Sequence, residues 1–334
     1  MVTTEQQAGA RRLLETLEGP IRFALLKWAL ESEVFNLCQS PITVETLAQK
    51  MDLPPKSLAL ALRALVASGW MEHEEKQYRT APAILPFVTA GGPHAMTETF
   101  RSMAQTRHAG LENLDALIAG TAQPAGPRLF DDAHWDASHR SLAAFHRAIA
   151  ADVVEPALTA LPEWPDARSF LEIGPGSAVL ARRLLSLRPD LAVTLFELPP
   201  VAERIAQEAS DLPISIVPGN YNDSLPENRF DIIWCSMTLY FHDSGLNALI
   251  ARLVERLAPG GVLVSFHEAL TANRTGPSEH VIGRLLPALR HGDVSFCDGE
   301  IAGAMADAGL KRPTSQTLST PFGHFRLDAA RKEA

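Results

Sequence analysis

Residues 169–200, SFLEIGPGSAVLARRLLSLRPDLAVTLFELPP, contain an apolar strand, a glycine turn, a helix and a second apolar strand. Residues 170–173 are a short apolar run typical of a buried parallel strand, and Gly174 and Gly176 interrupt it. A helical pattern and another apolar run follow, and the second run ends at Glu197. Ligands bind at the carboxyl ends of the strands in a doubly wound sheet, so the turn and Glu197 are expected to share one crevice. The pattern predicts the half of a doubly wound sheet that binds a nucleoside.

Two features of the turn indicate which nucleoside binds. A dinucleotide-binding turn has a third glycine three residues after the second, where this chain has Val179. Glu172, just before the turn, would repel a diphosphate, but it suits a ligand with a cationic sulfonium and an amino group. S-adenosylmethionine is such a ligand and is the predicted cofactor. The glycines alone are also compatible with another α/β protein, because a short glycine motif is not specific.

Residues 171–177 (LEIGPGS) and 196–201 (FELPPV) together resemble the first two motifs of class I S-adenosylmethionine-dependent methyltransferases. More narrowly, they resemble the small-molecule O-methyltransferase family that includes plant caffeate and bacterial polyketide enzymes. The family usually has an aspartate where this chain has Asn220, whose amide could still bond the adenine edge. The cofactor-binding residues implied by the resemblance are Glu172, Gly174, Gly176, Glu197, Leu198, Gly219, Asn220 and Tyr221.

Composition limits the classes of function. The chain has 334 residues, of which 46% are hydrophobic and 21% charged, so it can bury the cores of two domains. A formal net charge of −9 argues against a broad nucleic-acid surface. Three widely spaced cysteines indicate neither a disulfide framework nor a zinc site, and no metal is expected. The polar amino terminus and the lack of a long apolar run predict a cytoplasmic protein with no membrane partner.

Residues 1–90 have the pattern of a winged helix-turn-helix. In the family that the chain resembles, this module serves dimerisation and roofs the substrate pocket. The helices contain more leucine than one small core needs, which predicts a homodimer. The module is expected to have a helical region over residues 7–37, helices over 44–51 and 57–68, and wing strands over 70–73 and 77–80.

The same module permits a different function, that of a DNA-binding regulator whose second domain senses a metabolite. A recognition helix must offer side chains to bases and phosphates. The candidate helix carries only Arg63, with Lys56 just before it, and the wing adds Glu72, Glu74 and Glu75. This distribution of charge disfavours DNA binding, and no nucleic-acid partner is predicted.

The predicted fold class is α/β, a doubly wound, Rossmann-like methyltransferase sheet with an N-terminal, mainly helical winged-helix domain. Residues 162–334 alternate strands with helices and form the predicted cofactor-binding domain. Residues 91–161 are mostly helical and are expected to connect the domains and line the substrate pocket. Met103, Phe145 and His146 are pocket candidates there, although methionine and aromatic residues at helical spacing also form cores.

The residues that could perform chemistry lie just past the ends of two strands. Residues 240–243 (YFHD) resemble the Leu-His-Asp motif that holds the catalytic base of the O-methyltransferase family, so the base carries over to His242. The acidic position that orients the base carries over to Glu268. Asp243 and His267 are alternative bases. The structural alternatives are a capping or loop histidine at His242 and a solvated loop carboxylate at Glu268.

The resemblance implies methyl transfer to a hydroxyl, phenolic in character, of a small aromatic substrate of natural-product type. A phenol is mostly neutral at pH 7, and a neutral imidazole can take its proton as the methyl group arrives. The chain departs from the family because no tryptophan follows Asp243 and no lysine or arginine lies shortly before His242. These departures also admit N- or C-methyl transfer, or other S-adenosylmethionine-dependent chemistry on the same scaffold.

Overall fold

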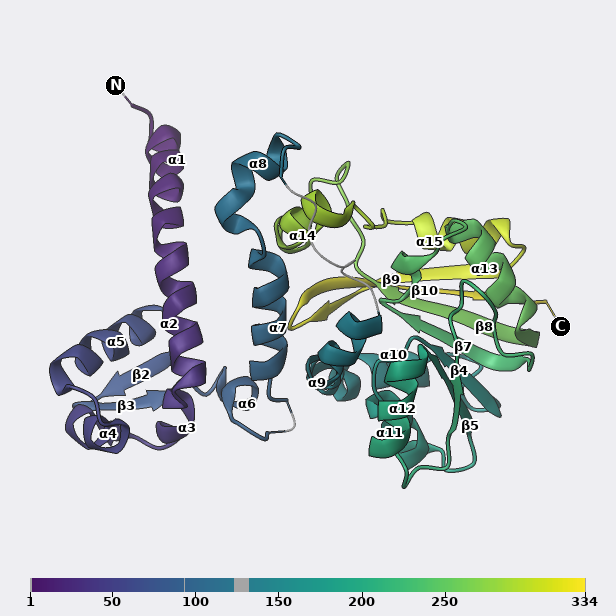
Figure 1. The fold of residues 1–334 in the computed structure, drawn as a ribbon, viewed down its shortest axis with the longest axis horizontal. Coiled ribbons are helices and arrows are strands. Elements are labelled where there is room, and N and C mark those ends of the chain that lie inside the picture. Colours follow the sequence, from purple (N-terminus) through teal and green to yellow (C-terminus); the bar gives the residue numbers. More distant parts are fainter. Residues whose placement is uncertain (1, 93, 123–131, 334) are drawn as a thin grey trace. The chain divides into compact units, whose positions relative to one another are not determined.

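The computed structural model describes residues 2–92, 94–122 and 132–333 (Figure 1). The chain divides into two compact units, Met1–Arg101 and Ser102–Ala334. The sequence placed boundaries after residues 90 and 161, so the expected connector, residues 91–161, is shared between the two units and lies mostly in the second. The residues at 122–127 include two prolines and a glycine, which predict a break in the helical pattern, and this stretch falls largely outside the described residues.

The first unit has the winged-helix pattern that the sequence predicts. Its three short strands form an antiparallel sheet in the order β1-β3-β2. The Thr43 hydroxyl accepts a hydrogen bond from the Thr46 N–H and so caps α4. The elements are α1 Thr4–Glu15, η1 Thr16–Glu18, α2 Gly19–Glu31, α3 Val34–Leu37, β1 Ile42–Thr43, α4 Val44–Met51, α5 Pro55–Ala67, β2 Met71–Glu74, β3 Gln77–Thr80 and α6 Leu85–Val88.

The second unit is built on a seven-stranded sheet in the order β6-β5-β4-β7-β8-β10-β9. The first five of these are parallel, and β9 and β10 add an antiparallel hairpin. This topology confirms the predicted fold class. The strands are β4 Ser169–Ile173, β5 Ala192–Glu197, β6 Ser215–Pro218, β7 Phe230–Ser236, β8 Leu257–His267, β9 Lys311–Thr320 and β10 Gly323–Arg331.

Helices cover both faces of this sheet and enclose two cores (Figure 1). One core lies under α9, α10, α11 and α12, and the other lies under α13 and α15. The helical elements are α7 Thr97–His108, which spans the boundary between the units, and then η2 Leu111–Asn113, α8 Leu114–Ile118, α9 Asp132–Ile149, the π-helical turn η3 Ala150–Val154, α10 Glu155–Thr159, α11 Val179–Leu187, α12 Pro199–Glu208, η4 Leu239–Phe241, α13 Leu246–Glu255, α14 Ser278–His291 and α15 Glu300–Asp307.

The alternation of side chains along β4 distributes its residues between the two cores. Phe170 belongs to the first core, whereas Leu171 and Ile173 belong to the second. Glu172 therefore points to the apolar face that carries Phe170. Burying a carboxyl group on that apolar face is unfavourable because the group loses its contacts with water. Its presence there points to a ligand.

No helix in the described part of the chain is both long and apolar enough to cross a membrane.

Candidate active site

The glycine turn after β4 lies where the strand order reverses, because β5 and β7 flank β4 on its two sides. Gly174 and Gly176 both have positive φ, +62° and +61°. A Cβ on Gly174 would lie 2.3 Å from the Thr238 Oγ1, which belongs to the loop after β7. Only glycine fits this conformation and this close approach. A reversal of strand order at a glycine turn is the usual ligand crevice of such sheets.

Glu197 at the end of β5 fastens this turn. One of its carboxylate oxygens accepts a hydrogen bond from the Gly176 N–H at 2.8 Å, and the other accepts one from the Leu198 N–H at 2.7 Å. Burial raises the pKa of Glu197, and the two backbone N–H groups oppose that rise. The structure thus brings together the glycines and the carboxylate that the sequence placed in one crevice.

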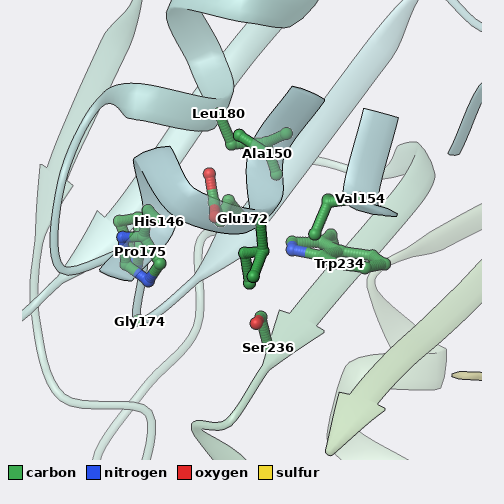
Figure 2. Close-up of a pocket in the computed structure, with 10 residues that line it drawn as sticks. His146, Ala150, Val154, Glu172, Gly174, Pro175, Leu180, Trp234 and Ser236 are labelled. Atoms are coloured by element: carbon green, nitrogen blue, oxygen red, sulfur yellow. The ribbon is translucent and has the colours of Figure 1, made fainter. Parts of the chain in front are cut away.

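Glu172 faces a small pocket beside the turn, which Figure 2 shows together with Gly174, His146 and Trp234. Its Oε2 and the Trp234 Nε1 are both buried, and neither has a hydrogen-bond partner within residues 2–92, 94–122 and 132–333. Burial and the neighbouring Glu197 raise the pKa of Glu172 to about 8. The protein therefore holds this carboxyl group protonated at neutral pH until a ligand supplies a partner or a positive charge.

Glu172→Gln should change how stability depends on pH. Because the folded pKa of Glu172 is about 8 and the ordinary value is 4.5, wild-type stability falls as pH rises between these values. The difference in free energy of unfolding, variant minus wild type, should therefore increase with pH in that window, by at most about 1.4 kcal/mol per pH unit. Above the window this difference should stay constant. Urea unfolding at a series of pH values measures this. The exposed Glu203→Gln on α12 should show no such slope, and parallel wild-type and Glu172→Gln profiles would contradict the assignment.

These groups fit the predicted cofactor. Two carboxyl groups, one of them with an unpaired oxygen, suit a ligand with a sulfonium charge and an amino group. The two positive-φ glycines leave room for a ligand to approach the backbone. Glu197 stands at the end of the strand next to the turn, where this class of sheet binds a ribose.

His146 on α9 lies next to the glycine turn. Its Nδ1 shares a hydrogen bond with the Ser177 hydroxyl at 2.8 Å, and its ring lines the pocket in Figure 2. Burial, with His139 and Arg147 nearby, lowers the pKa of His146 to about 4, so the ring is neutral. Phe145 instead stacks on Phe322 and packs against the first core. Of the predicted pocket candidates Met103, Phe145 and His146, only His146 lines this pocket.

His242 follows η4, immediately after the loop from β7. The Asn222 side chain braces both of its chain neighbours: the Asn222 amide donates to the Phe241 carbonyl at 2.9 Å, and its oxygen accepts from the Asp243 N–H at 3.0 Å. The His242 Nδ1 is buried and has no hydrogen-bond partner in the described part of the chain. Asp243 itself is exposed. The sequence did not indicate these contacts of Asn222, because a strand and a turn separate it from His242.

Glu268 does not orient His242 as the resemblance implied. The Glu268 Oε2 accepts a hydrogen bond from the Tyr240 hydroxyl at 3.0 Å and forms an ion pair with Arg284. The Arg284 guanidinium also lies 4.6 Å over the Tyr240 ring. Burial alone would raise the pKa of Glu268, but Arg284 and His280 outweigh it and lower the pKa. The carboxylate is paired, through Arg284, with α14, whose apolar residues recur at helical spacing.

His267 is not free to act as a base. Its Nε2 accepts hydrogen bonds from the N–H groups of Thr238 and Leu239, both at 3.1 Å. Its Nδ1 bonds the Ser265 hydroxyl at 2.8 Å. Burial and Arg284 lower the pKa of His267 to about 3. The lone pair is occupied, so this histidine fixes the loop after β7 and does not accept a substrate proton.

The remaining predicted cofactor residues follow β6. A Cβ on Gly219 would lie 2.6 Å from the Phe196 ring, so the chain packs directly on that ring. The Asn220 side-chain oxygen accepts from the Asn222 N–H at 2.9 Å. The Tyr221 hydroxyl donates to the Thr238 carbonyl at 2.7 Å and is buried. Tyr221 therefore satisfies its polar group inside the protein.

Comparison with known proteins agrees with this geometry. Residues 170–261 match the model of the methyltransferase domain. The chain is 25% identical to demethylspheroidene O-methyltransferase of Rhodobacter capsulatus over 75% of its own length and 64% of that protein's length. It is 24% identical to the N,N-dimethyltransferase OxyT of Streptomyces rimosus over 97% of both chains. Human N-acetylserotonin methyltransferase, solved with S-adenosylmethionine, superposes with a TM-score of 0.75, 19% identity and full coverage of both chains.

The fold, the glycine turn with its two carboxyl groups and these matches define a class I S-adenosylmethionine-dependent methyltransferase. The chain has the fold of the solved methyltransferases on which it superposes, and its cofactor is S-adenosylmethionine. The class expected from the sequence is thereby confirmed.

Proposed function

We propose that this enzyme transfers a methyl group to a phenolic hydroxyl of a small aromatic molecule, with His242 as the general base. One observation carries the proposal. The edge of the sheet that holds the glycine turn and Glu197 also presents a histidine whose Nδ1 has no protein partner. That histidine contrasts with His267, whose ring nitrogens are both occupied.

S-adenosylmethionine, when bound, supplies a methyl group on a positively charged sulfur. Glu172, Glu197 and the glycine turn would hold it, and Leu198, Gly219 and Asn220 would border it. The chain's own part in the chemistry is to align the hydroxyl and to remove its proton. The His242 imidazole receives that proton, and Asn222 keeps the backbone on both sides of His242 in place. The loop that carries His242 is also held by Tyr240, whose hydroxyl donates to the Glu268 carboxylate, and Glu268 is in turn paired with Arg284.

Glu197→Ala should weaken cofactor binding. The change removes a carboxylate that can accept charge-assisted bonds and that also fastens the Gly176 N–H. We expect a loss of ~1.5 to 3 kcal/mol in the binding of S-adenosylhomocysteine by titration calorimetry. Glu203→Ala, which removes an exposed carboxylate from α12, is the matched control and should bind as the wild type does. Equal affinities for Glu197→Ala and the control would overturn the cofactor assignment.

The function itself is tested by incubating the purified protein with S-adenosylmethionine and a panel of hydroxylated and aminated arenes, and by reading product masses. Methylation of phenols supports the proposal. Methylation confined to amines would support a second candidate, N-methyl transfer. A specific observation favours that candidate: Glu268 is committed to Arg284 and Tyr240, so His242 lacks the carboxylate that was expected to orient it. One of the relatives is also an N,N-dimethyltransferase.

The first unit supports a homodimer. Leu13, Leu14, Leu17 and Ile21 have exposed fractions of 64 to 74%, and α1 buries no residue. Such a continuous exposed apolar surface is typical of an isologous interface. We also place the enzyme in the cytoplasm, since its three cysteines are free thiols, which a reducing compartment preserves.

A further inference from the structure

A groove in the second unit lies between α14 and the segment formed by the end of α7, η2 and α8. Its walls are largely apolar, and several of the side chains are exposed to solvent. Leu111 is 53% exposed, Leu285 47% and Ile282 73%. A flat apolar molecule could cover these side chains, so the walls of the groove suit an aromatic ligand.

One cation that lines this groove, Arg107, has no partner among the residues that the structure describes. The half-buried Arg107 guanidinium makes no hydrogen bond or ion pair with any residue in the described ranges. It lies flat against Gly283 of α14, where an added Cβ would come within 2.9 Å of the guanidinium carbon. Glycine at this helical position therefore admits the guanidinium. A half-buried cation without a partner is energetically unfavourable unless a ligand supplies an opposite charge.

The neighbouring acidic groups are already engaged. Glu268, whose charge acts on Arg107, forms its ion pair with Arg284 and accepts from Tyr240. Glu279, which also lines the groove, bonds the His324 Nδ1 at 3.0 Å. The pair of arginines, Arg107 and Arg284, therefore shares one carboxylate, Glu268, which is already bonded to Arg284 and Tyr240.

The groove is linked to the loop that carries the proposed base. Arg284 extends from α14 to Glu268 at the end of β8, and Glu268 in turn holds the Tyr240 hydroxyl. Tyr240 is two residues before His242. The α14 wall of the groove and the His242 loop are thus joined by successive polar contacts at the carboxyl edge of the sheet, where the methyl acceptor is expected.

We propose that the groove binds the acceptor and that Arg107 binds an anionic group on it, most simply a carboxylate attached to the aromatic ring. The inference rests on the proposed function and narrows it to acidic aromatic acceptors. A guanidinium matches a carboxylate in two parallel hydrogen bonds, and the apolar walls accommodate the ring. Arg107 is then a specificity-determining residue, and Gly283 sets the position of its guanidinium.

The test compares matched acceptors. Hydroxylated one-, two- and three-ring arenes are each supplied as the carboxylate and as the carboxamide, and the ratio of kcat/KM values is measured. Wild type should prefer at least one carboxylate over its amide by about tenfold to 100-fold. Arg107→Gln should abolish this preference by raising KM for the carboxylate, with little change for the amide. Arg101→Gln is the matched control, because it removes an exposed arginine, paired with Glu98, from the same helix.

Gly283→Ala provides a second variant that retains every charge. Alanine is favoured over glycine within a helix, and the clash falls on the far end of a flexible side chain, so the fold should survive while the guanidinium shifts. We expect the carboxylate preference to fall severalfold. The proposal is overturned if no carboxylate exceeds its amide in the wild type, or if Arg107→Gln keeps the preference. Failure of the proposed function is distinct, since it would abolish methylation of carboxylates and amides alike.

Discussion

His242→Ala should lower the rate of phenol methylation by ~10²- to 10⁴-fold at pH 7, the range expected for loss of a general base. A phenol has an ordinary pKa near 10, so without a base nearly all of it stays neutral and unreactive at pH 7. The variant should recover rate as pH rises toward that value, because the phenol then ionises without help. Single-turnover measurements of product mass at pH 7 and at high pH provide the comparison.

Binding and neighbouring residues provide the controls for this prediction. His242→Ala should bind S-adenosylhomocysteine as the wild type does, since the glycine turn and Glu197 hold the cofactor side. His73→Ala, which removes an exposed imidazole from the wing of the first unit, should retain the wild-type rate. Asp243→Asn tests the alternative base. A wild-type rate for His242→Ala at pH 7 would eliminate the general-base mechanism and favour transfer by proximity alone.

Arg284→Met should destabilise the protein by about 3 to 5 kcal/mol, the usual cost of removing one partner from a buried ion pair. Methionine keeps most of the volume but leaves the Glu268 carboxylate with the Tyr240 hydroxyl and the more distant charges of His280 and Arg107. Urea unfolding followed by circular dichroism measures the loss. Arg290→Met on the same helix is the matched control and should cost far less, because Arg290 does not contact Glu268.

The pH dependence of this loss has a definite sign. Arg284 lowers the pKa of Glu268 below the ordinary 4.5, so the stabilisation is complete above that value and disappears as pH falls through the folded pKa. The difference between wild type and Arg284→Met should therefore shrink in acid. The double variant Arg284→Met with Glu268→Gln should recover part of the loss at neutral pH. A double variant as unstable as the sum of the single changes would show that the two side chains act independently.

The predicted sheet follows from local patterns. The strands β4 and β5, the glycine turn and α11 were all predictable, because strand and helix periodicity and glycine conformation are encoded within a few residues. The wing of the first unit followed in the same way. Glu172 was also found from sequence, since a carboxyl group at an apolar strand position is conspicuous without any structure.

The partners of the site residues were not predictable. Glu268 lies 16 residues from Arg284 in sequence, and only the packing of α14 brings the two together. The contacts of Asn222 and His267 also depend on tertiary structure. Asn222 bonds the backbone next to His242, and His267 accepts hydrogen bonds from two backbone N–H groups. Hydrogen bonds of this kind join separate strands and loops, so their pairing depends on three-dimensional packing. The sequence by itself determined the strands, the turn and the class of cofactor, because these depend on local periodicity and on residue type. Tertiary structure alone decided which carboxylate is paired, which histidine is free and which arginine lacks a partner.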